Sequence, residues 1–510
     1  MKIRRIITIL FALCLLLTSV GVTSAGAVDT KSVTTGAVVE EIPREGEPTV
    51  TECGSPAEAW SKAIQTADHA KEVVITLGSD WIEDTELTVG ASMHITLDLN
   101  GHYVHRNRNH EMKRNGYVFR VEENAVFTVR DSNPKGVGYK GVRGGVITGG
   151  ASSNTGGGIH IEENGEFRLQ GGTIYDCRTD EDGGAVYVDG SSMDTKFTMT
   201  GGRIYGCKTV NSNDECCGGG VYLRKGVVSI SNAKIDDCYS EDDGGAIYSC
   251  RGVINLDNVV FSGNYAKDNG GAIYTALDLA KYQATVIKAH NCIFAANHSD
   301  KDGGAVFIND NPDYNQAMLF HKCVFRSNSA NLKGGAIFIN DDNTALSSCE
   351  IVSNKAVEEG GGVYVDGRYN ITVMGLTKIM DNTSYKNDGV ANLALQEQSL
   401  GTARIIDAGL YKGSEIHFGS TSSSGVQVSE WVSTYQQQYF KADMGNLISN
   451  ESRTVKAQMI TSGSVFSNGF YAVTIIGVAG IIGAVILIVR QKKKNKAKEG
   501  GEENDQNNGA

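Results

Sequence analysis

The chain has 510 residues, of which 62 are Gly and 5 are Pro, and this composition excludes collagen and proline-rich linkers. Its formal net charge of -12 argues against a general nucleic-acid binder. The length is too great for one ordinary compact core, but it is natural for a solenoid that grows by adding repeats.

The first segment, residues 1–27, is predicted to be a secretory signal peptide. A short basic stretch precedes the apolar residues 6–17, and small residues at 24–27 offer cleavage sites. The alternative, a retained signal anchor, is disfavoured because the apolar run is short for a membrane span. We therefore expect the rest of the chain to be exported.

Residues 51–150 are predicted to form an N-terminal cap followed by irregular turns of a solenoid. Ser55 and Glu58 have the spacing of a capping box, and an amphipathic helix is expected over residues 55–70. Segments such as residues 94–99 then alternate apolar and polar residues, as strands do. A cap is expected because an open end would present unpaired strand edges.

A glycine tetrad, Gly-Gly-Ala-Ile/Val or a close variant, is the dominant feature of residues 151–395. Each copy is followed by a short alternating run such as VYV, and the copies recur every 26 to 35 residues. This spacing predicts a stacked β-helix with Gly at tight corners. The eight copies begin at Gly156, Gly183, Gly218, Gly244, Gly270, Gly303, Gly334 and Gly360.

A second motif accompanies the tetrads, with Ile or Phe followed three residues later by Asn or Cys. Equivalent residues of stacked parallel strands lie about 4.8 Å apart. The Ile/Phe positions therefore predict a core column, and the amides predict a turn column that hydrogen-bonds along the stack. Cys can fill the same small buried site. This predicted structural ladder comprises Cys177, Cys207, Cys238, Asn264, Asn297, Asn328, Asn354 and Asn382.

The cysteines of the two stacked columns are predicted to be free, buried thiols, whereas the states of Cys53, Cys216, Cys217 and Cys250 stay open. Ten remain after the signal peptide, and a second column holds Cys292, Cys323 and Cys349. Neighbouring turns would place their Cα atoms closer than disulfides usually require, with parallel side chains.

The C-terminal part is predicted to attach the ectodomain to a membrane. Residues 396–445 are expected to form a β-rich closure and residues 446–468 a polar spacer. The uncharged residues 470–489 have the length of a transmembrane helix. A basic and then acidic tail, residues 490–510, follows and is predicted to be cytoplasmic.

The paired motifs resemble those of the polymorphic membrane proteins, surface proteins whose repeats read GGA[ILV] and FxxN. GGAI stands at 270–273 and 334–337, and FxxN at 261–264, 294–297 and 325–328. The resemblance covers roughly residues 150–395. It implies a right-handed parallel β-helix of the pectate-lyase-like type, displayed on a cell surface and adhesin-like, without a catalytic site. Those proteins end in an outer-membrane β-barrel, whereas a single helix is predicted here, which suggests a bacterium with one membrane.

One aromatic position, in the middle of the run after each tetrad, supplies the candidate ligand surface. If this face points outward it is a ladder suited to sugars or peptide, and if it points inward it is core. Both remain open from the sequence. The candidates are Tyr187, Tyr222, Tyr248, Tyr274 and Tyr364.

Acidic turns provide the remaining candidates. Pairs such as Asp242 and Asp243 could serve a glycosidase, but Asp is also a common turn residue. No cofactor or metal site is predicted, apart from weak calcium binding at turns such as residues 179–182, 240–243 and 299–302. We therefore expect an adhesin or display stalk that binds host, matrix or glycan. The alternative is a membrane-tethered polysaccharide lyase or glycoside hydrolase.

Overall fold

The structure is a computed structural model. The residues that it describes are 36–43, 46–67, 71–106, 111–211, 216–276, 285–309, 318–341, 344–366, 369–386, 390–398, 401–402, 404–419, 428–429 and 436–443. The predicted signal peptide, spacer, transmembrane helix and tail lie outside these residues. Within them, no helix is long and apolar enough to cross a membrane.

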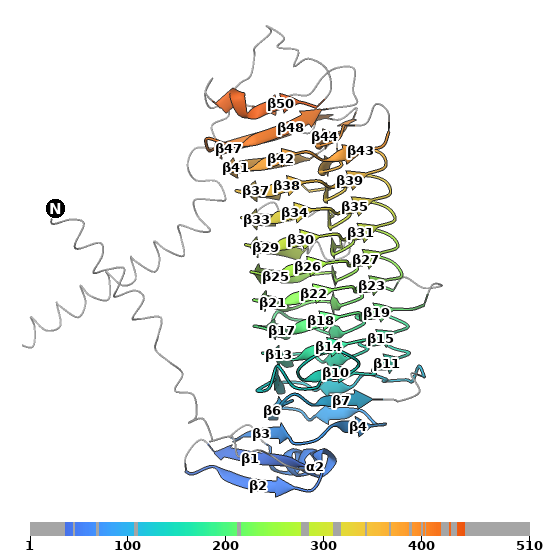
Figure 1. Cartoon of the computed structure of the whole chain (residues 1–510), viewed down its shortest axis with the longest axis vertical. Helices are drawn as coiled ribbons and strands as arrows, with labels where there is room; N and C mark the ends of the chain where they lie inside the picture. The colour runs from blue at the N-terminus through green and yellow to red at the C-terminus, as the bar shows by residue number, and fades with distance from the viewer. Residues whose placement is uncertain are drawn as a thin grey trace, which may run out of the picture.

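The chain forms an all-β, right-handed type of solenoid that rises from its N-terminal cap to its C-terminal closure (Figure 1). A typical turn contains four strands, such as β25 (Gly252–Asp257), β26 (Val260–Ser262), β27 (Tyr265–Ala266) and β28 (Ile273–Thr275). Each strand pairs in parallel with its equivalent in the next turn, so four columns of strands result. The predicted β-helix is confirmed.

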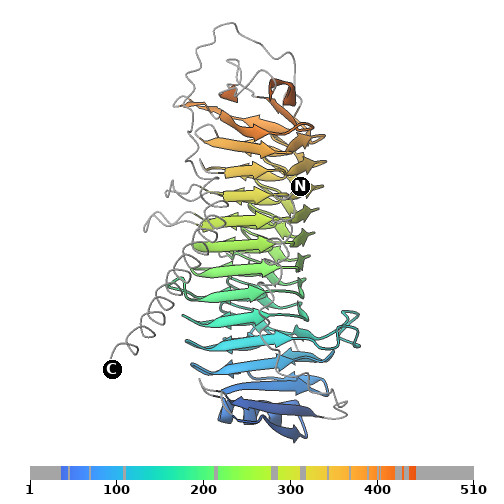
Figure 2. The same ribbon diagram turned by 90° about the vertical axis from the view of Figure 1, so that its left-hand side faces the viewer.

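The first column carries the longest strands, which lie one above the next in Figure 2. At its N-terminal end, β1 (Ala37–Pro43) and β2 (Thr49–Cys53) form an antiparallel hairpin, and β1 pairs antiparallel with the first strand of the column. The column contains β3 (Lys71–Leu77), β6 (His94–Asp98), β9 (Val126–Arg130), β13 (Glu166–Leu169), β17 (Lys196–Met199), β21 (Val227–Ser231), β25, β29 (Thr285–His290), β33 (Met318–His321), β37 (Thr344–Ser347), β41 (Asn370–Gly375), β47 (Arg404–Leu410) and β49 (Val428–Ser429).

The second column follows after a sharp corner and carries the Ile/Phe core positions. Its strands are β4 (Trp81–Glu83), β7 (Tyr103–Arg106), β10 (Val146–Thr148), β14 (Thr173–Tyr175), β18 (Arg203–Tyr205), β22 (Lys234–Asp236), β26, β30 (Ile293–Ala295), β34 (Val324–Arg326), β38 (Glu350–Val352), β42 (Lys378–Met380), β48 (Glu415–Gly419) and β50 (Phe440–Ala442).

The third column consists of two-residue strands that precede the glycine tetrads. They are β11 (Ala151–Ser152), β15 (Arg178–Thr179), β19 (Lys208–Thr209), β23 (Tyr239–Ser240), β27, β31 (His298–Ser299), β35 (Ser329–Ala330), β39 (Lys355–Ala356) and β43 (Thr383–Ser384).

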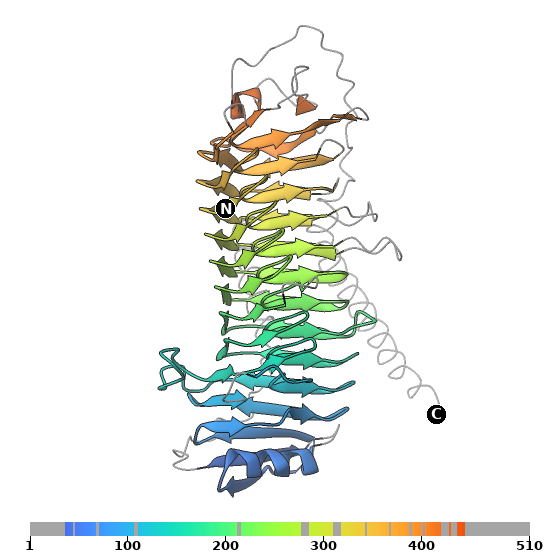
Figure 3. The ribbon, with the colours of Figure 1, turned by 90° about the vertical axis from the view of Figure 1, so that its right-hand side faces the viewer.

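The fourth column begins at the end of each tetrad and holds the candidate tyrosines. Its strands are β5 (Leu87–Val89), β8 (Phe119–Val121), β12 (Ile159–Ile161), β16 (Val186–Val188), β20 (Val221–Leu223), β24 (Ile247–Ser249), β28, β32 (Val306–Ile308), β36 (Ile337–Ile339), β40 (Val363–Val365) and β44 (Leu393–Leu395). A short antiparallel pair, β45 (Glu397–Gln398) and β46 (Gly401–Thr402), and a 3-10 helix, η1 (Gln436–Tyr439), belong to the C-terminal part of the described chain. The C-terminal end of the solenoid lies at the top of Figure 3, in orange and red.

The helix α2 (Pro56–Thr66) caps the N-terminal end of the core. Ser55 accepts a hydrogen bond from the Glu58 backbone N–H, as the capping box predicts. Trp60 lies within 5.7 Å of the Trp81 ring and 5.6 Å of the Phe119 ring, measured between ring centroids. The helix is shorter than the predicted residues 55–70, because Ala67 is already extended and β3 begins at Lys71.

The tetrad glycines are required by backbone geometry. Gly303 has a φ of +66°, which L side chains rarely adopt. A Cβ atom on its neighbour Gly304 would lie 2.2 Å from the backbone oxygen of Gly335, in the next turn. The corner therefore stacks so closely that a side chain has no room there.

The Asn positions of the second motif form a continuous amide ladder through the interior. The Asn328 side chain accepts from the backbone N–H and the Nδ2 amide of Asn297, at 3.0 and 2.9 Å. Its own Nδ2 donates to the Phe294 carbonyl and to the Asn354 Oδ1, both at 2.9 Å. Because this pattern repeats along the stack, each buried amide has a partner, as the sequence predicted.

The two ends of the amide ladder are closed differently. At one end, the backbone N–H of Cys238 donates to the Asn264 Oδ1, and no further amide is needed. Cys177, Cys207 and Cys238 continue the same position as fully buried free thiols. At the other end, Asn392 donates through both its backbone and its Nδ2 to the two carboxylate oxygens of Asp443. A carboxylate can end the ladder because it accepts hydrogen bonds but, unlike an amide, has no N–H donor that needs an acceptor in the next turn.

Replacing one ladder amide should destabilise the solenoid strongly. Asn328→Leu removes the acceptor of two Asn297 donors and the side-chain donor to the Phe294 carbonyl, so we expect a loss of about 3 kcal/mol or more in unfolding free energy. Denaturant midpoints of the full chain measure this change. The exposed Asn331→Leu is the matched control and should shift the free energy by about 0.5 kcal/mol at most. Equal effects of the two substitutions would contradict the ladder's role.

Candidate functional site

The predicted tyrosine column is a continuous stack of rings on the fourth column of strands. The centroids of Tyr187 and Tyr222 are 5.2 Å apart, those of Tyr222 and Tyr248 are 5.1 Å apart, and those of Tyr248 and Tyr274 are 5.2 Å apart. The interplanar angles are 9°, 9° and 10°. Each ring therefore covers the face of the next, and mainly ring edges and hydroxyls are left for a ligand.

The column is not equally accessible along its length. Tyr222, Tyr248 and Tyr274 are half-buried, whereas Tyr187 is buried and Tyr364 is only 1% exposed. The Tyr364 hydroxyl donates to Gln396, and its ring packs with Phe338, Val390 and Ala394. Tyr364 therefore belongs to a satellite core, and its prediction as a ligand-surface residue is wrong. The sequence could not show that residues beyond 385 cover this face.

A second ladder runs through the residues that directly precede the tetrads. The Asp182 Oδ1 accepts the backbone N–H of Cys217 at 2.9 Å, and the Asp243 Oδ1 accepts that of Asn269 at 2.8 Å. The Asn269 Oδ1 in turn accepts the backbone N–H of Asp302 at 3.1 Å. We call this set the pre-glycine column: Asp182, Cys217, Asp243, Asn269, Asp302, Lys333 and Glu359. Its carboxylates serve as turn acceptors, which is the structural role that the sequence favoured.

Burial perturbs these carboxyl groups. Burial, the largest cause, and the nearby carboxylate of Asp242 together raise the pKa of Asp182 and of Asp243 to about 7. The Cys217 backbone N–H and the Tyr222 hydroxyl, which hydrogen-bond Asp182, act in the opposite direction. Burial also raises the pKa of Asp302, to about 6. Asp182 and Asp243, which are separated by the turn that carries Cys217, thus lie close to half-protonated near neutral pH.

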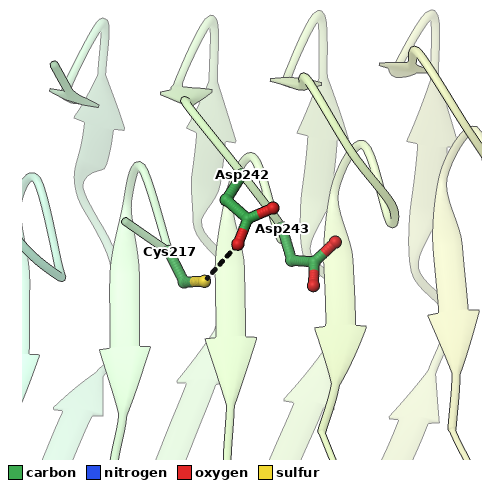
Figure 4. Close-up of side chains that lie close together, drawn as sticks. All are labelled: Cys217, Asp242 and Asp243. Carbon is green, nitrogen blue, oxygen red and sulfur yellow. Dashed lines mark hydrogen bonds between the residues drawn. The ribbon is translucent and has the colours of Figure 1, made fainter. Parts of the chain in front are cut away.

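Cys217, Asp242 and Asp243 bring a thiol and two carboxyl groups together (Figure 4). Their ligand atoms lie within 4.8 Å of one another, and the Cys217 Sγ is 3.7 Å from the Asp242 Oδ2. Burial raises the pKa of the Cys217 thiol, as do Asp182 and Asp243. Carboxylate and thiolate are ligands that divalent metals use, so this set is the candidate metal position among the described residues.

A groove of about 510 Å³ opens where the tyrosine column and the pre-glycine column meet. The Asn309 amide donates to the Tyr274 hydroxyl at 3.3 Å, and the Tyr222 hydroxyl lies 3.0 Å from the Cys250 Sγ. Asp268 also lines the groove and pairs with Lys301. Its lining residues are Asp182, Cys217, Tyr222, Asp242, Asp243, Tyr248, Asp268, Tyr274, Ala276 and Asn309.

The groove combines predicted and unpredicted residues. Tyr222, Tyr248 and Tyr274 were candidates for a ligand surface, and the structure brings them together with carboxylates that the sequence treated as separate turns. The recurrence of Asp immediately before a tetrad was the available signal for the pre-glycine column. The sequence holds a further acidic pair at Asp236 and Asp237, and Asp236 lies on β22, where it pairs with Arg203 and Lys234.

The raised carboxyl pKa values predict that acidification stabilises the fold. A group whose folded pKa lies above its unfolded value binds more protons when folded, so stability rises as pH falls between those values. From about pH 8 to about pH 6 we expect the thermal midpoint to rise, with each carboxyl contributing at most about 1.4 kcal/mol per pH unit. His160, whose pKa is lowered by burial, opposes this only below its ordinary value of 6.5.

The double variant Asp182→Asn/Asp243→Asn should flatten this dependence, because it keeps the Oδ1 acceptors and removes the titrating groups. Exposed Asp257→Asn serves as the control and should keep the original slope. A thermal midpoint that falls between pH 8 and pH 6 in the unmodified chain would refute the prediction.

Comparison with known proteins supports the assignment of the repeat. A family model described as the Chlamydia polymorphic membrane protein repeat matches residues 258–276 and 322–340. Each matched segment contains an FxxN motif followed by GGAI, on the second and fourth columns of strands. No curated protein and no solved structure matches the chain significantly. The parallel solenoid therefore carries repeats of the polymorphic membrane protein type on its strands.

Proposed function

We propose that this protein is a surface-displayed, adhesin-like binding protein whose solenoid holds a recessed ligand groove away from a bacterial membrane. The groove of about 510 Å³ on a regular stack is the observation that carries this proposal. The repeat type supports surface exposure. The secretory signal predicted for residues 1–27 and the span predicted for residues 470–489 support an extracellular, single-pass arrangement.

The groove is suited to binding because its polar groups are fixed before a ligand arrives. The tyrosine rings are held by mutual stacking, and Asp182 and Asp243 are held by backbone N–H groups of the next turn. Such preorganisation reduces the entropy lost on binding. Burial raises the pKa of Tyr222 and Tyr248, so their hydroxyls stay protonated and can donate hydrogen bonds.

Liposomes that carry the full chain should adhere to at least one member of a panel of glycans and matrix proteins. Tyr222→Phe/Tyr248→Phe removes two groove hydroxyls while keeping the stacked rings, so we expect about five-fold weaker retention or more. Tyr411→Phe, at a 66% exposed residue outside the groove, is the control and should retain adhesion. Failure of the unmodified chain to adhere to any surface would leave only a structural stalk.

A polysaccharide-degrading enzyme is the second candidate, and one observation favours it. Asp242 and Asp243 place carboxyl oxygens within 4.8 Å of each other, and burial raises the pKa of Asp243 to about 7, so that this group can hold a proton near neutral pH. Paired carboxyl groups, one protonated and one ionised, are what glycoside hydrolysis needs. Incubation of the full chain with uronic-acid and neutral polysaccharides tests this alternative. Release of reducing or unsaturated ends would establish it.

A further inference from the structure

The carboxylates beside the groove carry a negative charge that the hydrogen bonds of the pre-glycine column do not require. That column needs only an oxygen that accepts the backbone N–H of the next turn, and Asn269 performs this role with an uncharged amide. Asp182 and Asp243 perform it with one carboxylate oxygen each. Asn would therefore serve the fold equally well at both positions, and the charge calls for a separate explanation.

The chemistry of the groove is that of a cation site. Four carboxyl groups, those of Asp182, Asp242, Asp243 and Asp268, line it together with three tyrosines. Within the described part of the chain, Lys301 pairs with Asp268, and ion pairs on Asp182 or Asp243 are absent. A bound cation would place opposite charge beside Asp182 and Asp243.

The stacked rings narrow the choice of cation. Sugars and guanidinium groups commonly pack on aromatic faces, but the faces of Tyr222 and Tyr248 are covered by their neighbours at 5.1 to 5.2 Å. What remains is a row of hydroxyls and carboxylates. A primary ammonium group, compact and with three hydrogen-bond donors, matches such a row.

We propose that this groove binds primary ammonium groups, carried as lysine side chains on a segment of a partner polypeptide. Successive turns present acceptors at intervals of about 4.8 Å, so neighbouring lysines of one segment can be held by different turns. The proposal rests on the proposed binding function and specifies its ligand. It makes Asp182, Asp242 and Asp243 recognition residues in addition to their local structural roles.

Binding of a fluorescent trilysine peptide to the full chain tests this proposal, at about pH 8 in the presence of a metal chelator. The matched probe is the same peptide with acetylated lysines, which keeps the shape and loses the charge. We expect the lysine peptide to bind at least about ten-fold more tightly. Asp182→Asn/Asp243→Asn should lose about ten-fold in affinity, and Asp242→Asn, whose side chain lies outside the pre-glycine column, should also weaken binding.

Asp302→Asn is the control because it removes a pre-glycine carboxylate outside the groove lining. It should bind the lysine peptide as the unmodified chain does. Equal affinity for the acetylated peptide, or equal losses in Asp302→Asn and the groove variants, would overturn the proposal. A chain that adheres to the surface panel but fails this test keeps the proposed function and loses only the ligand assignment. A chain that adheres to nothing loses the proposed function, whatever the peptide result.

Discussion

The need to satisfy buried hydrogen-bonding groups from one turn to the next governs this structure. A β-helix packs its corners so closely that polar groups inside them have no access to water, and an unpaired group there is costly. The protein meets this need with two side-chain ladders, one of interior amides and one directly before the glycine tetrads. Both ladders link equivalent residues of successive turns, so the same side-chain hydrogen bonds satisfy the buried polar groups throughout the stack.

The candidate groove arises from the same repetition. Because every turn places an aromatic residue in the middle of the fourth strand, the rings stack and fix one another's orientation. The pre-glycine residues lie one corner away, so carboxylates and phenol hydroxyls converge without any dedicated loop. A ligand site of this kind depends on small departures from the repeat, such as Asp where another turn has Asn.

The repeat made much of the fold predictable from sequence. The glycine tetrads predicted the corners. The FxxN spacing, as in Phe294 to Asn297 and Phe325 to Asn328, predicted the Phe in the core and the Asn in the amide ladder. The direction in which the aromatic ring faces point could not be predicted, because it depends on side-chain packing between turns. The burial of Tyr364 and the partnership of Asn392 with Asp443 also escaped prediction. Both depend on C-terminal residues that follow no repeat.

The carboxylate at Asp443 has a consequence for how such a protein can change in length. The side-chain oxygen of each interior Asn accepts hydrogen bonds from the preceding turn. The backbone N–H of the same residue donates to the side-chain oxygen of the Asn in the following turn. Duplicating a turn between Asn264 and Asn382 would therefore add one Asn that brings both its donors and its acceptor. The hydrogen bonds at the two ends of the amide ladder would stay unchanged. The reach of the groove from its base can thus grow or shrink by whole turns, in steps of about 4.8 Å, while the two terminators stay the same.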